Sequence, residues 1–404
     1  MRKILSLLMI LTITFSITVI GVNDVGIAIG QGKIFLGGGA LQDDNSEVWN
    51  ALYSLSAVTN PKVAVFCSGS PSLLDAQDSY YNDTALYWSW EKLFKNYGFD
   101  PVFIPIAIDN YQTAAYDQYL VDIVNNSDVV WFNGGDQSRH SRVLLKNDGT
   151  DTPLMTAVRN VFNNGGVIAG SSAGAAIQGE KTYGEGISYG YLEANGMIEK
   201  SISDVSLADP SNYDNGGYMK GFGFLSNIDA CIDTHVGGRG RIGRMAVAMR
   251  ELNNRIAIGV DENSAITIEN GIGKVYGEYG VLILDGSDAL YHDDSYYKAT
   301  GLKAYSLSSQ DSIDFATMSI TSSKQEIDSP YYSSAYDSRE IFYQDEAFKV
   351  MERLVDSDSS LAIGKSKDRK PQFQFRFSKN PYTKGYWSNN KYTVDNLDLD
   401  IDYN

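Results

Sequence analysis

Two adjacent serines lie among small residues in the segment VIAGSSAGAA, at positions 167–176. Within it, GSSAG at 170–174 fits the pattern G-x-S-x-G. In that pattern a serine occupies a tight turn between a strand and a helix, and the glycines keep Cβ atoms out of the crowded backbone. The pattern makes Ser172 a candidate nucleophile and puts Ser171 at the variable position. Such turns are common, so the rest of the chain must support the assignment.

A serine hydroxyl is a poor nucleophile at neutral pH and needs a base, usually histidine, within hydrogen-bond reach. The chain has three histidines, His140, His235 and His292. His140 lies in GGDQSRHSR, which we interpret as a loop, and His292 lies in YHDDSYY, where we expect a surface position. His235 follows the apolar run IDACIDT, which in a parallel sheet would put it at the same rim as the serine turn. We therefore predict that His235 is the general base.

Three arginines follow His235 in the segment VGGRGRIGRMAVAMREL. Arg239, Arg241 and Arg244 stand at the start of a predicted helix, where exposed N–H groups and the helix dipole are already electropositive. Positive side chains are unfavourable there, unless the helix start must hold a carboxylate with guanidinium groups and free N–H groups together. The arrangement predicts a carboxylate-binding site.

Strands and helices alternate along the segments that would position these residues. Apolar runs such as KVAVFCSG, DPVFIPIAI and DVVWFNGG are separated by stretches with helical spacing, for example SEVWNALYSLSA at 46–57, with Ser46 as its cap. Runs that are apolar throughout indicate a mostly parallel sheet with helices on both faces, hence an α/β fold. Active sites in such sheets form at the carboxyl ends of strands, where GGD at 134–136 and SSAG at 171–174 should meet.

The composition predicts a globular protein that is not a nucleic-acid binder. The 404 residues include 43% hydrophobic and 21% charged side chains, enough for one large domain or one domain with an appendage. The net charge of −17 argues against nucleic acid and anionic membrane surfaces and permits a basic ligand. We expect a catalytic domain over 30–300 and a polar C-terminal appendage over 301–404. No spacing typical of metal ligands is present in the sequence, so no metal or cofactor is predicted.

The first residues resemble a targeting segment. A charged start, MRK, precedes the apolar run ILSLLMILTITFSITVIG. Serines and threonines in this run weaken it as a permanent membrane span, and no cleavage site stands out. We expect residues 1–22 to be a signal peptide of a secreted protein, with a retained membrane anchor as the alternative. Cys67 and Cys231 lie in strand-like runs and are expected to be buried rather than joined in a disulfide.

Four segments together resemble the cyanophycinases, within the serine peptidases that include aspartyl dipeptidase. The segments are FNGGDQSR at 132–139, GSSAGAA at 170–176, IDTHVGGRGRIGR at 232–244 and GVDENSAI at 259–266. The likeness covers roughly residues 30–280. It implies a Ser-His hydrolase on a flavodoxin-like or class I glutamine amidotransferase-like sheet that cuts peptide bonds next to β-linked aspartate. The family's polymer, cyanophycin, has a polyaspartate backbone with arginine on each side-chain carboxylate.

The resemblance also implies roles for individual residues. Ser172 would be the nucleophile and His235 the base, with the backbone N–H groups of Gly135 and Ala173 meeting the oxyanion. Positions associated with substrate binding in the family are held here by Gln137, Asp233, Arg239, Arg241 and Arg244. One departure is Asp233-Thr234-His235, where cyanophycinases often have Asp-Gln-His. A second is the long span between Ser172 and His235, which resembles an inserted loop.

The acid that orients the histidine is expected between Ser172 and His235. Glu185 and Glu193 are the candidates, and we favour Glu185 because it lies nearer the serine in a glycine-flanked turn. The true partner should place a carboxylate oxygen about 2.6 to 3.2 Å from a ring nitrogen of His235. An approach by Asp261 or Glu262 instead would contradict this assignment.

Three functions compete at this point. The first is an exported cyanophycinase that releases β-Asp-Arg dipeptides, and the second is a secreted exopeptidase for short aspartyl or isoaspartyl peptides. The third is a catalytically inactive binding protein of the same fold, which would fit a triad without its acid. The expected partner is a peptide or cyanophycin substrate. No nucleic acid is expected, and a homodimer is left open.

Overall fold

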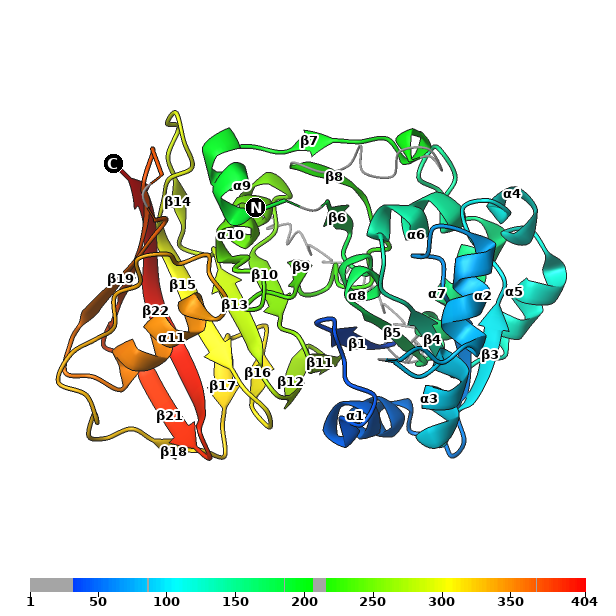
Figure 1. The fold of residues 1–404 in the computed structure, drawn as a ribbon, viewed down its shortest axis with the longest axis horizontal. Coiled ribbons are helices and arrows are strands. Elements are labelled where there is room, and N and C mark those ends of the chain that lie inside the picture. Colours follow the sequence, from blue (N-terminus) through cyan, green and yellow to red (C-terminus); the bar gives the residue numbers. More distant parts are fainter. Residues whose placement is uncertain (1–31, 86, 185, 206–215, 368) are drawn as a thin grey trace, which may run out of the picture.

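The computed structural model describes residues 32–404 except 86, 185, 206–215 and 368 (Figure 1). The predicted signal peptide or anchor at 1–22 therefore lies outside the described residues. Within the described part, no helix is both long enough and apolar enough to cross a membrane.

A nine-stranded sheet combines the first strands of the described chain with later ones, in the order β17-β16-β12-β11-β1-β5-β4-β2-β3. Its parallel half consists of β1 (Lys33–Gly37), β5 (Val167–Ser171), β4 (Val129–Phe132), β2 (Lys62–Phe66) and β3 (Asp100–Ile104). Its antiparallel half consists of β11 (Ser264–Glu269), β12 (Ile272–Gly277), β16 (Ser312–Asp314) and β17 (Ser319–Thr321). The predicted α/β architecture is confirmed, and β5, which leads to the serine turn, lies within the parallel half of this sheet.

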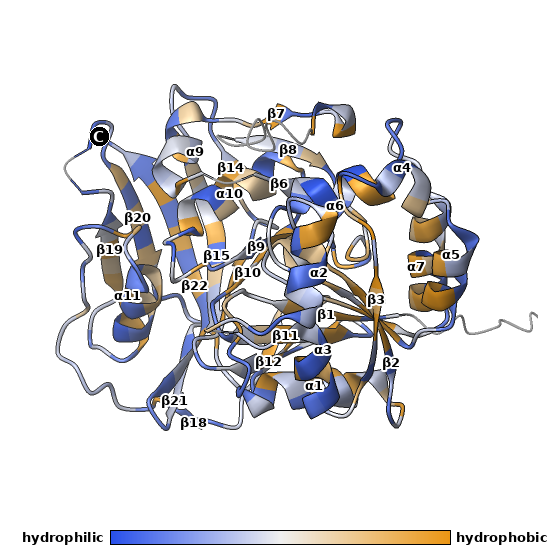
Figure 2. Cartoon of the chain, turned by 45° about the vertical axis from the view of Figure 1, so that its right-hand side comes forward, coloured by the Kyte–Doolittle hydropathy of each residue, from blue (hydrophilic) through white to orange (hydrophobic). Residues whose placement is uncertain are grey.

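Helices cover both faces of the parallel strands, as their uniformly apolar sequences predict. One face packs against α1 (Ser46–Ser56), α2 (Leu73–Tyr81) and α3 (Trp90–Asn96). The other packs against α5 (Gln118–Asn125) and α7 (Pro153–Asn163). Successive residues of β1 alternate between the two cores: Phe35 packs with α1, while Ile34 and Leu36 belong to the core of α5 and α7. Figure 2 shows apolar residues on α7, which packs against the sheet, and hydrophilic residues on the visible surfaces of α2 and α3.

A second sheet carries His235 at one end and the C-terminal residues at the other, in the order β18-β21-β22-β15-β13-β10-β9. Only β9 (Ala230–Thr234) and β10 (Ile256–Val260) in this order are parallel. The antiparallel strands are β13 (Val281–Asp285), β15 (Ala299–Leu307), β22 (Lys391–Tyr403), β21 (Lys384–Ser388) and β18 (Gln325–Glu326), with β14 (Leu290–Tyr291), β19 (Leu361–Lys365) and β20 (Phe373–Ser378) paired alongside.

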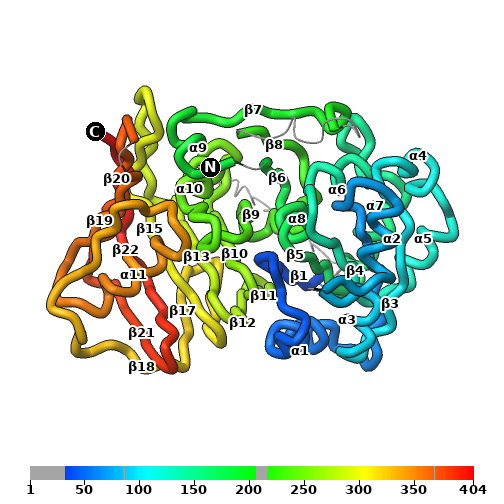
Figure 3. Tube along the Cα trace, in the orientation of Figure 1, coloured from blue at the N-terminus to red at the C-terminus, as the bar shows by residue number. Residues whose placement is uncertain are grey.

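The residues beyond 300 continue this second sheet. The predicted boundary at residue 300 falls inside β15, which pairs with β13 on one side and with β22 on the other. One apolar core joins α10 (Ile242–Glu251) and α9 (Ser188–Ala194) with α11 (Glu346–Val355) of the C-terminal part. Figure 3 shows the yellow-to-red chain continuing the sheet beyond β13, with the green strand β10 on the other side of β13.

Smaller elements complete the chain. A three-stranded sheet contains β6 (Lys181–Tyr183), β8 (Gly217–Lys220) and β7 (Ile198–Glu199). The short helices are α4 (Tyr111–Ala114), α6 (Gln137–Leu144) and α8 (Ala173–Ala176), with a 3-10 turn at Ile202–Asp204. His140 lies within α6, so its prediction as a loop residue is wrong. Cys67 and Cys231 are both buried free thiols, as predicted.

Candidate active site

Ser172 occupies the tight turn that its sequence pattern predicts. It lies between the end of β5 and the start of α8 with φ 54° and ψ −118°, a strained conformation for a residue other than glycine. The flanking glycines are required sterically. A Cβ on Gly170 would lie 2.2 Å from the Gly174 carbonyl oxygen, and a Cβ on Gly174 would lie 2.1 Å from the Phe132 carbonyl oxygen. Crowding from three backbone segments therefore holds Ser172 at the end of its strand.

A hydrogen-bonded chain of three side chains begins at this serine. Ser172 Oγ lies 2.8 Å from His235 Nε2, and His235 Nδ1 lies 2.7 Å from Glu262 Oε1. A neutral imidazole that donates from Nδ1 to the carboxylate has its Nε2 lone pair free to accept from the serine hydroxyl. Ser172, His235 and Glu262 thus have the geometry of a nucleophile, a base and an orienting acid.

The acid of this triad was not predicted correctly. Glu185 lies outside the described residues, and Glu193 is exposed on α9, while both ring nitrogens of His235 already have other partners. The physical reason is the pairing of β9 with β10, which are parallel and end together, so that the residues after β10 arrive beside His235. The rule that identified His235, a polar residue directly after an apolar parallel strand, applies equally to GVDENS and could have identified Glu262.

The serine and the histidine come from different sheets, whereas we predicted one shared rim. Ser172 follows β5 of the nine-stranded sheet, and His235 follows β9 of the second sheet. The residues after β1 join them, since the Gly38 carbonyl accepts from His235 N at 2.8 Å. Gly39, at φ +101°, lies against the imidazole: a Cβ there would be 2.1 Å from His235 Cε1. Only glycine fits between the two sheets at this point.

Asp261 fastens the loop that follows the histidine. One carboxylate oxygen, Oδ1, accepts the backbone N–H groups of both Gly237 and Gly238 at 3.0 Å. The side chain is buried, and burial raises the pKa of Asp261 to about 6. Asp261 and Glu262 are therefore neighbours with separate tasks, because the first holds the loop and the second contacts the ring.

Two backbone N–H groups are placed to meet an oxyanion. Gly135 lines the same pocket as Ser172, and Ala173 is the first residue of α8, where an N–H has no intrahelical partner. Among the described residues, no acceptor bonds either N–H. The N–H of Ser172 itself is used, since it donates to the Gly37 carbonyl at 2.9 Å. Gly135 needs to be glycine, because a Cβ at its φ of +125° would lie 2.3 Å from the Gly69 carbonyl oxygen.

Of the predicted substrate-binding residues, Arg239 lines the catalytic pocket and the others do not. Arg244 donates from Nε to Asp233 Oδ2 at 2.7 Å, and Arg241 donates to the Thr234 carbonyl at 2.9 Å. All three charged side chains, Asp233, Arg241 and Arg244, are buried. Burial alone would raise the pKa of Asp233, but the two guanidinium groups hold it below its usual value.

Asp233, Arg241 and Arg244 therefore bind one another and do not line the catalytic pocket, so their role in substrate binding stays a prediction. The physical reason is that the acid at the end of β9 neutralises the arginines at the start of α10, leaving only Arg239 exposed at the pocket. Gln137 donates to the Tyr183 carbonyl and does not line the pocket.

The pocket above the triad has a volume of about 510 Å³. Besides Ser172, His235 and Arg239, it is lined by Asp43 and by the aromatic residues Tyr87, Trp88 and Trp90. Asp43 Oδ2 accepts from the Trp88 backbone N–H at 2.6 Å, and partial burial raises the Asp43 pKa. No local pattern predicts Asp43 or these aromatic residues, because they lie in loops and at a helix start outside any recognisable motif.

The charge state of His235 suits a general base. Burial lowers its pKa to about 4, and the positive charge of Arg239 lowers it as well, while Glu262 acts in the opposite direction. The imidazole is therefore neutral at neutral pH and able to accept the serine proton. In the part of the chain that the structure describes, no group of three or more His, Cys, Asp or Glu side chains is arranged to hold a metal ion.

Comparison with known proteins points to one family. Residues 76–275, which include all three triad residues, match the model of Peptidase family S51. The chain is similar to a cyanophycinase of Synechococcus elongatus, with 29% identity over 164 residues that cover 40% of this chain and 43% of that protein. It is also similar to a cyanophycinase of Trichormus variabilis, with 28% identity over 172 residues, 42% of this chain and 49% of the relative.

These matches confirm the predicted resemblance to the cyanophycinase-like serine peptidases. The chain spans about half the length, or less, of the curated relatives it matches. A crystal structure of a peptidase from an acI-B1 Actinobacterium aligns with a TM-score of 0.47 and 17% identity, covering 70% of this chain and 98% of that one.

Proposed function

We propose that this protein is a serine peptidase that hydrolyses cyanophycin next to β-linked aspartate and releases β-Asp-Arg dipeptides. The observation that carries the proposal is the hydrogen-bonded chain from Ser172 through His235 to Glu262. The likeness to cyanophycinases supports the choice of substrate. The triad supports a hydrolase over an inactive binding protein, because Glu262 supplies the acid whose loss that alternative required.

In the first half of the reaction, Ser172 Oγ attacks the carbonyl carbon of the scissile bond and its proton moves to His235 Nε2. Glu262 stabilises the resulting imidazolium, and the N–H groups of Gly135 and Ala173 stabilise the negative oxygen of the tetrahedral intermediate. The intermediate collapses as the C–N bond breaks. His235 then gives its proton to the leaving amine, and an acyl ester on Ser172 remains.

In the second half, a water molecule attacks the ester carbonyl and transfers a proton to His235. The second tetrahedral intermediate collapses with cleavage of the bond to Ser172 Oγ, which recovers the proton from His235. The cycle consumes one water and leaves every catalytic group in its starting protonation state.

The pocket offers complementary groups for a unit that contains both a carboxylate and an arginine. Arg239 provides a guanidinium for a free carboxylate. Asp43, with the neighbouring ring of Trp88, provides a carboxylate and an aromatic surface for the arginine side chain. We further infer that the protein is exported, because the charged start and apolar run at 1–22 are typical of a signal peptide. Sequencing the N-terminus of the protein recovered from the culture medium tests this point.

The decisive experiment measures the release of β-Asp-Arg from purified polymer by the protein and by its Ser172→Ala variant. We expect release by the parent protein only. Hydrolysis of short isoaspartyl peptides without hydrolysis of the polymer would replace the proposal with the exopeptidase alternative. No hydrolysis of either, together with no labelling of Ser172 by a serine-directed phosphonate, would establish an inactive protein.

A further inference from the structure

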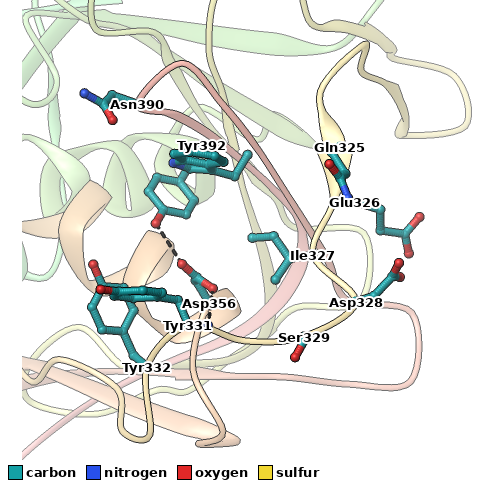
Figure 4. A pocket seen from close by; sticks show the side chains of 11 residues that line it. Gln325, Glu326, Ile327, Asp328, Ser329, Tyr331, Tyr332, Asp356, Asn390 and Tyr392 are labelled. Carbon is teal, nitrogen blue, oxygen red and sulfur yellow. Dashed lines mark hydrogen bonds between the residues drawn. The ribbon is translucent and has the colours of Figure 1, made fainter.

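A second pocket, of about 780 Å³, lies at the far end of the second sheet, formed around β18, β21 and β22 (Figures 1 and 4). The described residues that line it are different from those that line the catalytic pocket. It belongs entirely to residues beyond 300, the region that the four sequence motifs do not cover. Its chemistry therefore needs its own explanation.

Aromatic rings form much of the wall of this second pocket. Figure 4 shows Tyr331, Tyr332 and Tyr392 gathered on one side, opposite Ile327. Trp387 also lines the pocket. Tyr331 is 81% exposed and Trp387 is 45% exposed, so packing in the core does not account for either ring. A cluster of exposed aromatic rings around a hollow is typical of a ligand site.

The charged groups in this wall are acidic. Glu326, Asp328 and Asp356 line the pocket, and among the described residues no lysine or arginine does. Asp356 is held in place, because Tyr392 Oη donates to one carboxylate oxygen at 2.8 Å and the Tyr331 backbone N–H donates to the other at 2.8 Å. The nearby Lys384 pairs with Glu326 at 3.1 Å, and the charge of Lys379 interacts with Asp356. Asp328 is then the lining carboxylate for which the described residues form no ion pair.

One ring of this aromatic cluster already stacks with a guanidinium group of the protein itself, that of Arg353. The Arg353 Cζ atom lies 3.2 Å from the centre of the Tyr332 ring. A guanidinium and a sugar can both stack on aromatic faces and hydrogen-bond to carboxylates, but only the guanidinium also gains charge attraction. Because acidic side chains line this pocket and no lysine or arginine is among its described lining residues, its charge favours a guanidinium ligand over a neutral sugar.

We propose that this pocket binds the guanidinium group of an arginine side chain on an extended ligand. The identity of that ligand rests on the proposed function: the arginine-bearing polymer would be held here while another part of it occupies the catalytic pocket. Binding at two sites raises the effective concentration of the polymer at the triad without changing the chemistry of a short substrate.

The first test measures binding of polyaspartate that carries arginine on its side chains to the full-length Ser172→Ala protein. Trp387→Ala and Asp328→Asn, each added to that protein, should raise the dissociation constant about tenfold, within the range of a lost cation–π or charge contact. The control is Tyr119→Ala, which removes an aromatic ring that is 71% exposed on α5 and should leave binding unchanged. Melting temperatures check that each variant is folded.

The second test uses the catalytically intact protein and separates this inference from the proposed function. In Trp387→Ala, KM for the polymer should rise while kcat and KM for a short isoaspartyl peptide stay unchanged. If the polymer is not hydrolysed but Trp387→Ala still weakens binding of the arginine-bearing chain, the proposed function fails and the guanidinium site stands. If Trp387→Ala and Asp328→Asn leave that binding unchanged, or a neutral oligosaccharide binds with the same dependence on Trp387, the site proposal is wrong.

Discussion

The described residues include two serine-histidine pairs with nearly the same geometry. Ser172 Oγ lies 2.8 Å from a ring nitrogen of His235, and Ser68 Oγ lies 2.7 Å from a ring nitrogen of His140. Burial lowers the pKa of both histidines to about 4. The contact between hydroxyl and imidazole, and the charge state of the ring, are therefore the same in a candidate active site and in a buried core.

The surroundings of the two pairs differ in everything else. Ser68 and His140 are fully buried, and the second ring nitrogen of His140 bonds the Asn133 carbonyl at 3.1 Å. His235 instead has the Glu262 carboxylate on its second nitrogen, and Ser172 opens into a pocket beside unused backbone N–H groups. A nucleophilic serine is therefore defined by access to solvent, an acid on the second ring nitrogen and oxyanion donors. The pair alone does not define it.

The largest expected difference between the pairs is in turnover. Ser172→Ala should reduce kcat by about a millionfold, because the nucleophile is removed. Ser68→Ala should leave kcat within a few-fold of the parent and lower the free energy of unfolding by about 1 to 3 kcal/mol, since it leaves a buried nitrogen without its partner. Rates divided by the concentration of titrated active sites give kcat, and urea unfolding gives the free energy of unfolding. If folded Ser68→Ala lost as much turnover as Ser172→Ala, the conclusion that only Ser172 acts as the nucleophile would be wrong. Ser171→Ala should retain activity as a neighbouring control.

The acid provides the next largest effect. Glu262→Gln keeps a hydrogen-bond partner for His235 but removes the charge that stabilises the imidazolium, so kcat should fall by about ten-thousandfold. Glu193→Gln is the matched control on α9 and should have no effect. Steady-state kinetics with the short peptide decide this. If the two variants were equally active, Glu262 would not be the acid of the triad.

The same contrast between buried and accessible groups divides the arginines. Arg244→Gln breaks a buried ion pair with Asp233 and should lower the free energy of unfolding by about 3 to 5 kcal/mol. Arg239→Gln, at the pocket, should leave stability unchanged and raise KM. Thermal unfolding and kinetics of both variants give the answer. A stable Arg244→Gln protein with an increased KM would support its predicted role in binding substrate.

The smallest expected effect is a shift in pH dependence. The neutral form of His235 is the active base, so kcat/KM should fall on the acid side with an apparent pKa of about 4, below the ordinary histidine value. Arg239 lowers the pKa of His235, so Arg239→Gln should move this limb to higher pH. Ser68→Ala should leave it in place, because His140 takes no part in turnover. If the acid limb moved in Ser68→Ala and stayed in place in Arg239→Gln, the limb would report His140 and its assignment to His235 would be wrong.

Local rules were enough to predict the elements that present the nucleophile and the base. The serine turn follows from G-x-S-x-G, and the position of His235 follows from an apolar strand that ends directly before it. The acid depends on which strand pairs with β9, a long-range fact that no local pattern contains. The burial of Arg244 likewise depends on Asp233 lying opposite it. The positive charge at the helix start, which suggests a ligand site in the sequence, is neutralised by this acid in the fold.

The continuity of the second sheet across residue 300 also bears on solubility. β15 pairs with the outer side of β13, β22 pairs with β15, and the apolar core beneath them is shared with α10. A chain that ended at residue 300 would expose the backbone hydrogen-bonding groups of β13 as an unprotected edge, next to apolar side chains of that core. Exposed edges of this kind pair with edges of other molecules. We therefore expect the last hundred residues to keep the triad-bearing part of the protein from aggregating, whatever they bind.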